Sequence, residues 1–127
     1  NAHAVVISSD GAFLSGGLSI EAAFQENVPI TVVIDNNGGL TTISQQQERL
    51  FGHDRHVATD FRDIPFHSLF EGLGGYGELV EDPGEVAAAV KRAIASGRTA
   101  CVNVRTRGVI SPIVAAVTSK RDKASIE

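Results

Sequence analysis

The sequence has few of the features that mark disulfide-rich, membrane or nucleic-acid-binding proteins. Its 127 residues include one cysteine, Cys101, which builds no disulfide framework. No apolar run approaches the roughly 18 residues of a membrane-spanning helix. No basic run is longer than Lys120-Arg121, and the net charge is −4. We therefore expect no membrane or nucleic acid as a partner, no signal peptide, and a cytoplasmic protein.

What the chain does contain is typical of a globular α/β domain. It is 43% hydrophobic and 20% charged. Apolar, β-branched runs alternate with stretches of helical periodicity, which predicts a parallel sheet flanked by helices. We expect strands over residues 4–8, 29–34, 76–80 and 99–105, and helices over residues 15–27, 64–73 and 83–96. The first run is apolar almost throughout, which is typical of a central strand covered on both faces.

Two polar turns follow the first two expected strands. Ser9-Asp10-Gly11 offers a carboxylate, and Asp35-Asn36-Asn37-Gly38-Gly39 offers side-chain amides and a flexible glycine backbone. Each turn alone is typical of an ordinary loop. In a parallel sheet, however, both lie at the carboxyl ends of neighbouring strands, where such sheets bind ligands. Together they supply hard oxygen ligands for a small divalent cation.

The same two turns carry a resemblance to a known family. Asp10-Gly11, a spacer and then Asn36-Asn37 resemble the Gly-Asp-Gly…Asn-Asn signature of thiamine diphosphate-dependent enzymes. The flanking residues 26–30 and 45–49 are also similar, and the likeness extends over residues 4–106. It is strongest to acetolactate synthase-like, oxalyl-CoA decarboxylase-like and 2-hydroxyacyl-CoA lyase-like proteins. Ser9 replaces the first glycine of the signature, and a positive φ at this position would be costly for serine.

The resemblance implies two cofactors, thiamine diphosphate and Mg²⁺. It implies that the metal ligands are Asp10, Asn37 and the carbonyl group of Gly39. Cofactor-binding residues would then be Asp10, Gly11, Ala12, Asn37, Gly39 and Leu40. Among these, the backbone N–H groups of Gly11 and Ala12 precede a helix and could face the diphosphate. The sequence identifies no catalytic residue.

The resemblance also predicts the domain organisation. Residues 1–107 would form the diphosphate- and Mg²⁺-binding α/β domain without its first strand and helix, and residues 108–127 a C-terminal tail or lid. A glutamate that activates the cofactor would come from remaining domains or a companion chain. We therefore expect a homo- or hetero-oligomer, and no activity from this chain alone. Lys120, Arg121 and Lys123 of the tail would attract an anionic substrate such as an acyl-CoA.

Several functions are compatible with these observations. The leading interpretation is a thiamine diphosphate-dependent carbon–carbon lyase, carboligase or decarboxylase, with 2-hydroxyacyl-CoA lyase-like activity preferred. Its substrate would be a small 2-oxo or 2-hydroxy acid or an acyl-CoA. The alternatives are an acetolactate synthase-like transferase and a non-catalytic subunit that retains the fold. A dinucleotide-binding domain is disfavoured because no Gly-x-Gly-x-x-Gly turn follows a strand.

The remaining polar residues give weaker signals. Residues 38–63 form a long polar connection, with a helical turn or two across residues 44–51; such connections are usually functional or mobile. His53 and His56 lie in it and could approach a substrate, although a solvated or structural role is the simpler interpretation. Cys101 lies in an apolar strand, where we expect a buried, inert thiol.

Overall fold

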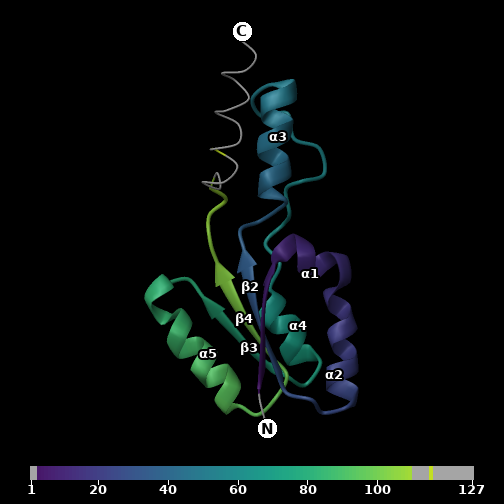
Figure 1. Ribbon diagram of the computed structural model, residues 1–127, viewed down its shortest axis with the longest axis vertical. Coiled ribbons are helices and arrows are strands. Elements are labelled where there is room, and N and C mark those ends of the chain that lie inside the picture. The colour runs from purple at the N-terminus through teal and green to yellow at the C-terminus, as the bar shows by residue number, and fades with distance from the viewer. Residues whose placement is uncertain (1–2, 110–114, 116–127) are drawn as a thin grey trace.

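The computed structural model describes residues 3–109 and 115, and it contains a parallel sheet with helices on both faces (Figure 1). The strands are β1 (Ala4–Ser9), β2 (Ile30–Asn36), β3 (Tyr76–Val80) and β4 (Ala100–Arg105). The helices are α1 (Asp10–Gly16), η1 (Gly17–Ile20), α2 (Glu21–Gln25), α3 (Thr41–Phe51), α4 (Phe66–Gly72), η2 (Pro83–Glu85) and α5 (Val86–Ala95). The predicted α/β fold is therefore confirmed.

The order of the strands in the described sheet is β1-β2-β4-β3, and all three pairings are parallel. Ile34 of β2 lies opposite Ser8 of β1 and Asn103 of β4, so the three strands end near one another. Their carboxyl ends point toward α3 and the start of α1 (Figure 1). This end of the sheet carries both polar turns.

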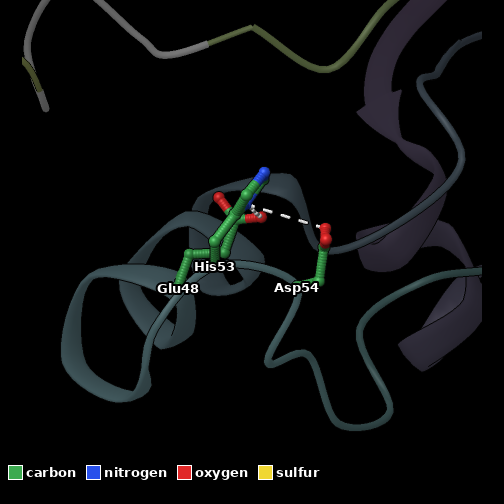
Figure 2. Close-up of side chains that lie close together, drawn as sticks. All are labelled: Glu48, His53 and Asp54. Atoms are coloured by element: carbon green, nitrogen blue, oxygen red, sulfur yellow. Dashed lines mark ion pairs between the residues drawn. The ribbon is translucent and has the colours of Figure 1, made fainter.

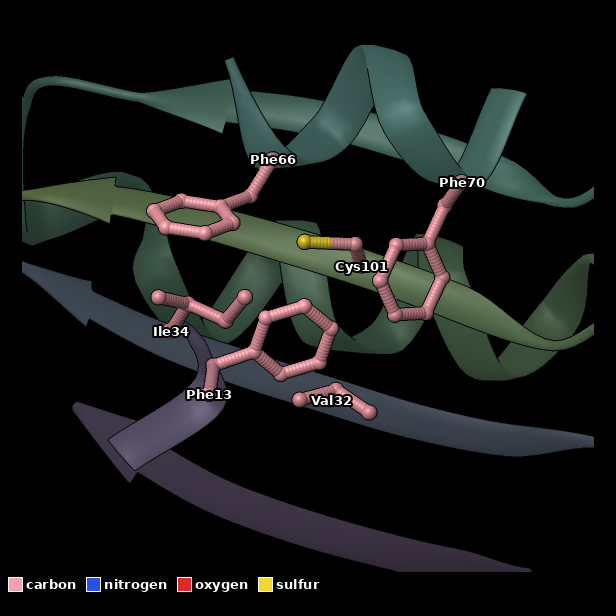
Figure 3. Packing of buried hydrophobic residues seen from close by; sticks show 6 residues of the cluster. All are labelled: Phe13, Val32, Ile34, Phe66, Phe70 and Cys101. Atoms are coloured by element: carbon pink, nitrogen blue, oxygen red, sulfur yellow. The ribbon is translucent and has the colours of Figure 1, made fainter. Parts of the chain in front are cut away.

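Each face of the sheet has its own apolar core. On one face, aromatic side chains of α1 and α4 pack on β2 and β4; this cluster contains Phe13, Val32, Ile34, Phe66, Phe70 and Cys101 (Figure 3). The ring of Phe13 meets that of Phe66 edge-on, with centroids 5.6 Å apart. On the other face α5 covers β3 and β4, with Val80, Ala89, Ala93, Ala100 and Val102 buried. The two cores fix the sheet between its helices.

Cys101 is buried within the first of these cores. Its exposed fraction is 0%, and burial raises the pKa of the thiol to about 12. The prediction of a buried thiol is confirmed, and the raised pKa keeps the sulfur in its unreactive protonated form.

The first strand differs from the prediction of a central strand covered on both faces. β1 lies at the edge of the described sheet and pairs with β2 alone. Val5 and Val6 are each 46% exposed and Ile7 is 80% exposed. Among the described residues, no further strand pairs with its outer edge, and these side chains are only partly covered on the faces of the sheet, so a sequence typical of a buried strand is exposed here.

The helical segments predicted over residues 15–27 and 44–51 also differ from the structure. The helix expected over residues 15–27 begins earlier, at Asp10, because Ser9 caps it, and it is interrupted by η1. Gly17, the first residue of η1, leaves room for the ring of Phe13, since a Cβ there would lie 2.3 Å from that ring. α3 has 11 residues, longer than the predicted turn or two. None of the helices in the described part of the chain has the length and apolar character needed to cross a membrane.

Candidate functional site

The candidate site lies where β1 and β2 end side by side. Ser9 of β1 is in register with Asp35 of β2, so the turns after these two strands start at the same level. The first turn leads directly into α1, and the second passes through Asn37, Gly38 and Gly39 to α3. The predicted proximity of the two polar turns is thus present in the structure.

Asp10 joins the two turns through its side chain. The residue is 1% exposed. Its Oδ1 accepts the N–H of Gly11 at 2.7 Å, and its Oδ2 accepts the N–H groups of Gly38 and Gly39, both at 2.9 Å. Hydrogen bonds of this kind offset the cost of burying a carboxylate. Asp10 therefore fixes the second turn relative to the first.

The second turn depends on glycine at two positions. Gly38 has a φ of 83°, a left-handed conformation that glycine adopts at little cost. At Gly39 the reason is space, because a Cβ would lie 2.3 Å from the carbonyl oxygen of Thr59. The backbone therefore passes close to the segment around Thr59 and keeps its N–H groups directed at Asp10.

Asn37 and Leu40 complete this turn. The Oδ1 atom of Asn37 accepts a hydrogen bond from the hydroxyl of Thr41 at 2.8 Å, which fixes the amide oxygen beside the start of α3. Leu40 is 38% exposed and reaches across to the first turn. A Cβ on Gly11 would lie 2.4 Å from its Cδ2 atom, so Gly11 leaves room for the Leu40 side chain.

The predicted phosphate donors have internal partners in this structure. The N–H of Gly11 is bonded to Asp10, and the N–H of Ala12 donates to Ser9 Oγ at 3.2 Å. Ser9 has φ −80° and ψ 161°, an extended N-cap conformation that serine adopts without strain. The cost expected for serine at this position is therefore absent, and the residue caps α1 instead.

A third segment, which the sequence did not indicate, braces the second turn. The N–H of Leu40 donates to the carbonyl of Thr59, and the N–H of Phe61 donates to the carbonyl of Gly38, both at 2.8 Å. Gly39 and Asp60 form the antiparallel bridge between these bonds. The contact is distant in sequence and made by the backbone, so residue types gave little signal for it.

The histidines of this connection have different surroundings. His53 is 86% exposed in its side chain and lies near Glu48 and Asp54, at 3.4 and 3.7 Å (Figure 2). Their ligand atoms lie within 4.8 Å of one another, but the group is an exposed ion-pair cluster at the end of α3. His56 is only 23% exposed and lies between Glu48 and Asp60. The sequence did not indicate either arrangement.

The oxygen atoms of the two turns suit a small, hard cation. A carboxylate has about four acceptor positions, and three of those on Asp10 are used by N–H groups. The amide oxygen of Asn37 has one hydrogen bond, from Thr41, and therefore retains acceptor capacity. With the backbone carbonyl of Gly39, these residues offer the carboxylate, amide and carbonyl ligands that Mg²⁺ accepts.

Comparison with known proteins identifies the family. The model of the "Thiamine pyrophosphate enzyme, C-terminal TPP binding domain" matches residues 1–104; thiamine pyrophosphate is another name for thiamine diphosphate. The chain belongs to this family. The resemblance stated from the sequence is thereby confirmed, and the polar turns after β1 and β2 lie in a thiamine diphosphate-binding domain.

Relatives of two activities are similar to this member of the family. The acetolactate synthase large subunit IlvG of Mycobacterium tuberculosis is 37% identical over 103 residues, which are 80% of this chain and 18% of that protein. The 2-hydroxyacyl-CoA lyase of Arabidopsis thaliana is 27% identical over 116 residues, 88% of this chain and 20% of that protein. The chain thus spans about a fifth of the length of these relatives.

A solved structure shares the fold of this thiamine diphosphate-binding domain. It is the thiamine diphosphate-dependent 4-hydroxybenzoylformate decarboxylase of Rhodococcus jostii RHA1, with a TM-score of 0.74 and 24% sequence identity. The similarity covers 87% of this chain and 21% of that one.

The expected tail, residues 108–127, lies almost entirely outside the described residues, with only positions 108, 109 and 115 described.

Proposed function

We propose that the complete protein containing this chain is a thiamine diphosphate- and Mg²⁺-dependent enzyme that makes or breaks a carbon–carbon bond beside a carbonyl group. In it, this chain would hold the cofactor diphosphate through Mg²⁺. One observation supports the proposal most. In a member of this family, the carboxylate of Asp10 is hydrogen-bonded to the turn that contains Asn37 and Gly39, at one end of the sheet.

Each residue would have a separate task in binding. Asp10 would supply a carboxylate oxygen to the metal while its other contacts hold the glycine turn. Asn37 and Gly39 would supply an amide and a carbonyl oxygen. Gly11 and Ala12 would turn their N–H groups toward phosphate in exchange for their present acceptors, and Leu40 would contact the cofactor from the turn. These assignments follow from the ligand types and from the family resemblance.

The bound cofactor would supply a nucleophilic carbon and an electron sink for the bond that is made or broken. The chain's residues orient it and reduce the access of water to its charged end. Because the chain spans about a fifth of its relatives' length, we place the activating glutamate in the remaining domains or in a companion chain. The enzyme would then be a homo- or hetero-oligomer, with this chain inactive alone.

Two reactions have support from relatives. The Arabidopsis relative supports a 2-hydroxyacyl-CoA lyase-like activity, and the Mycobacterium relative supports an acetolactate synthase-like activity. Product analysis of the complete protein separates them. Cleavage of a 2-hydroxyacyl-CoA indicates the first activity, and formation of acetolactate indicates the second. Cofactor binding with neither product and with no decarboxylation of a 2-oxo acid indicates a non-catalytic subunit.

The metal-binding role of Asn37 is tested by a matched pair of variants. Asn37→Ala removes the amide oxygen, whereas Thr41→Val removes the hydroxyl bonded to it and leaves the oxygen in place. We expect calorimetry with the complete protein to show Mg²⁺-dependent thiamine diphosphate affinity reduced about tenfold or more in Asn37→Ala, since a charge-assisted contact contributes about 1.5–3 kcal/mol. Thr41→Val should retain affinity within about threefold of wild type. Equal losses of affinity in both variants would contradict a metal-binding role and indicate that Asn37 is only structural.

A further inference from the structure

We propose that His56 is a positioning residue for the turn from Asn37 to Leu40: with both ring nitrogens protonated, it fastens the bracing segment of residues 56–61 to α3. The proposal deepens the function proposed above, because it concerns the same turn. It does not place His56 in contact with cofactor or substrate.

The bracing segment is coupled to the turn by backbone contacts. Two hydrogen bonds of 2.8 Å, Leu40 to Thr59 and Phe61 to Gly38, lie on either side of the Gly39–Asp60 bridge. The space beside Gly39 is too small for a methyl group, since a Cβ would approach the Thr59 carbonyl to 2.3 Å. Any shift of residues 59–61 is therefore transmitted to the turn.

His56 connects this segment to α3. Its Nε2 lies 2.7 Å from Oε1 of Glu48 in α3, and its Nδ1 lies 3.1 Å from Oδ2 of Asp60. Ionised carboxylates only accept hydrogen bonds, so both contacts require an N–H on the ring. A neutral imidazole has one N–H, and one carboxylate would then face a ring lone pair. The geometry thus calls for the imidazolium form.

A second connection nearby does not titrate. The Gln47 side chain accepts the N–H of Val57 at 2.8 Å, and its amide lies 3.3 Å from the Val57 carbonyl. Ala58, the next residue, has a φ of 58°, which costs a non-glycine residue about 1–2 kcal/mol. Hydrogen bonds of His56 and Val57 on one side of Ala58, and of Thr59 on the other, stabilise this conformation. Gln47 therefore provides a pH-independent counterpart to His56.

The direction of the pH dependence follows from the two carboxylates that face His56. Hydrogen bonds to Asp60 and then Glu48 raise the pKa of His56, and the bond to His56 lowers the pKa of Glu48, which also lies near His53. The stabilisation that the His56 contacts give to the bracing segment is complete below the usual histidine pKa. It is lost as pH rises through the raised pKa of His56. The stabilisation from ionised Glu48 is lost as pH falls through the lowered pKa of Glu48. The contact is strongest between these limits.

The test uses amide hydrogen exchange of the complete protein without cofactor, at about pH 6 and about pH 9. We expect protection of the Leu40 and Phe61 amides, corrected for intrinsic exchange, to fall roughly fivefold or more at the higher pH. The buried Val102 amide should show no matching step. In His56→Gln the two amides should be equally weakly protected at both values. Gln47→Ala should lower protection at both and keep the step.

A second measurement gives the consequence for binding. The ratio of thiamine diphosphate dissociation constants, His56→Gln over wild type with Mg²⁺, should be about fivefold at the lower pH and approach one at the higher. A wild type without the exchange step, or a His56→Gln variant that retains it, would overturn the proposal. So would a ratio of one at both pH values. Because exchange is measured without cofactor, it tests His56 even if the proposed function fails.

Discussion

Asp10 illustrates how one buried side chain organises the site. Its carboxylate accepts three backbone N–H groups, two of them from the glycines that follow β2. The sequence was enough to predict that the two turns carrying Asp10 and Asn37 lie at one end of the sheet, because both follow apolar strands. It was not enough to predict the conformation of Ser9. Its φ of −80° shows that the position does not require the left-handed conformation of a glycine, and that serine can serve there as an N-cap.

Gly39 gives a prediction at the scale of one residue. In Gly39→Ala the new methyl group would contact the Thr59 carbonyl and separate the turn from its brace. We expect a loss of about 1–3 kcal/mol in the free energy of unfolding, measured by urea denaturation, and weaker cofactor binding. Gly72→Ala is the control, because a Cβ meets nothing within 4 Å at that helical position. Equal stability of both variants would contradict the close contact.

Among the elements, the strands followed the sequence most closely. β3 matches its predicted bounds, and β1 and β4 differ from theirs by one residue. Apolar, β-branched runs indicate such strands directly, whether the strand is buried or, like β1, exposed at the edge of the described sheet. The prediction over residues 44–51 missed the first three residues of α3, because Leu40 precedes the helix and provides no side-chain cap that would mark its start. The segment that braces the second turn was missed because it depends on backbone contacts between residues about twenty positions apart.

β1 gives a prediction at the scale of an element. Its exposed Val5, Val6 and Ile7, beside an edge that no described strand covers, should make the isolated 127-residue chain self-associate. Ile7→Lys should shift the chain toward monomer in size-exclusion chromatography with light scattering, since a charged edge residue opposes strand addition. Leu18→Lys, at a site 64% exposed in η1, is the control. A monomeric wild-type chain, or equal effects of both substitutions, would contradict this prediction.

For the whole molecule, the central claim concerns cofactor binding by a chain that spans about a fifth of its relatives' length. The family and the parallel fold were predictable because the two polar turns and the apolar strands are local patterns. The substrate was not, because the two turns were proposed only as ligands for a diphosphate and a metal, and the sequence assigns no catalytic residue. The decisive variants must therefore be made in the complete protein.

The most direct measurement is calorimetry of thiamine diphosphate binding, with and without Mg²⁺, by wild type, Asp10→Asn and Asp10→Ala. We expect tight, Mg²⁺-dependent binding by wild type. Asp10→Asn, which keeps the size of the side chain and loses its charge, should bind at least roughly a hundredfold more weakly, since losing a buried charged contact costs about 3 kcal/mol or more. Asp10→Ala should show no Mg²⁺-dependent binding, with its circular dichroism unchanged. Wild-type affinity in either folded variant would contradict the claim that Asp10 holds the metal and, through it, the diphosphate.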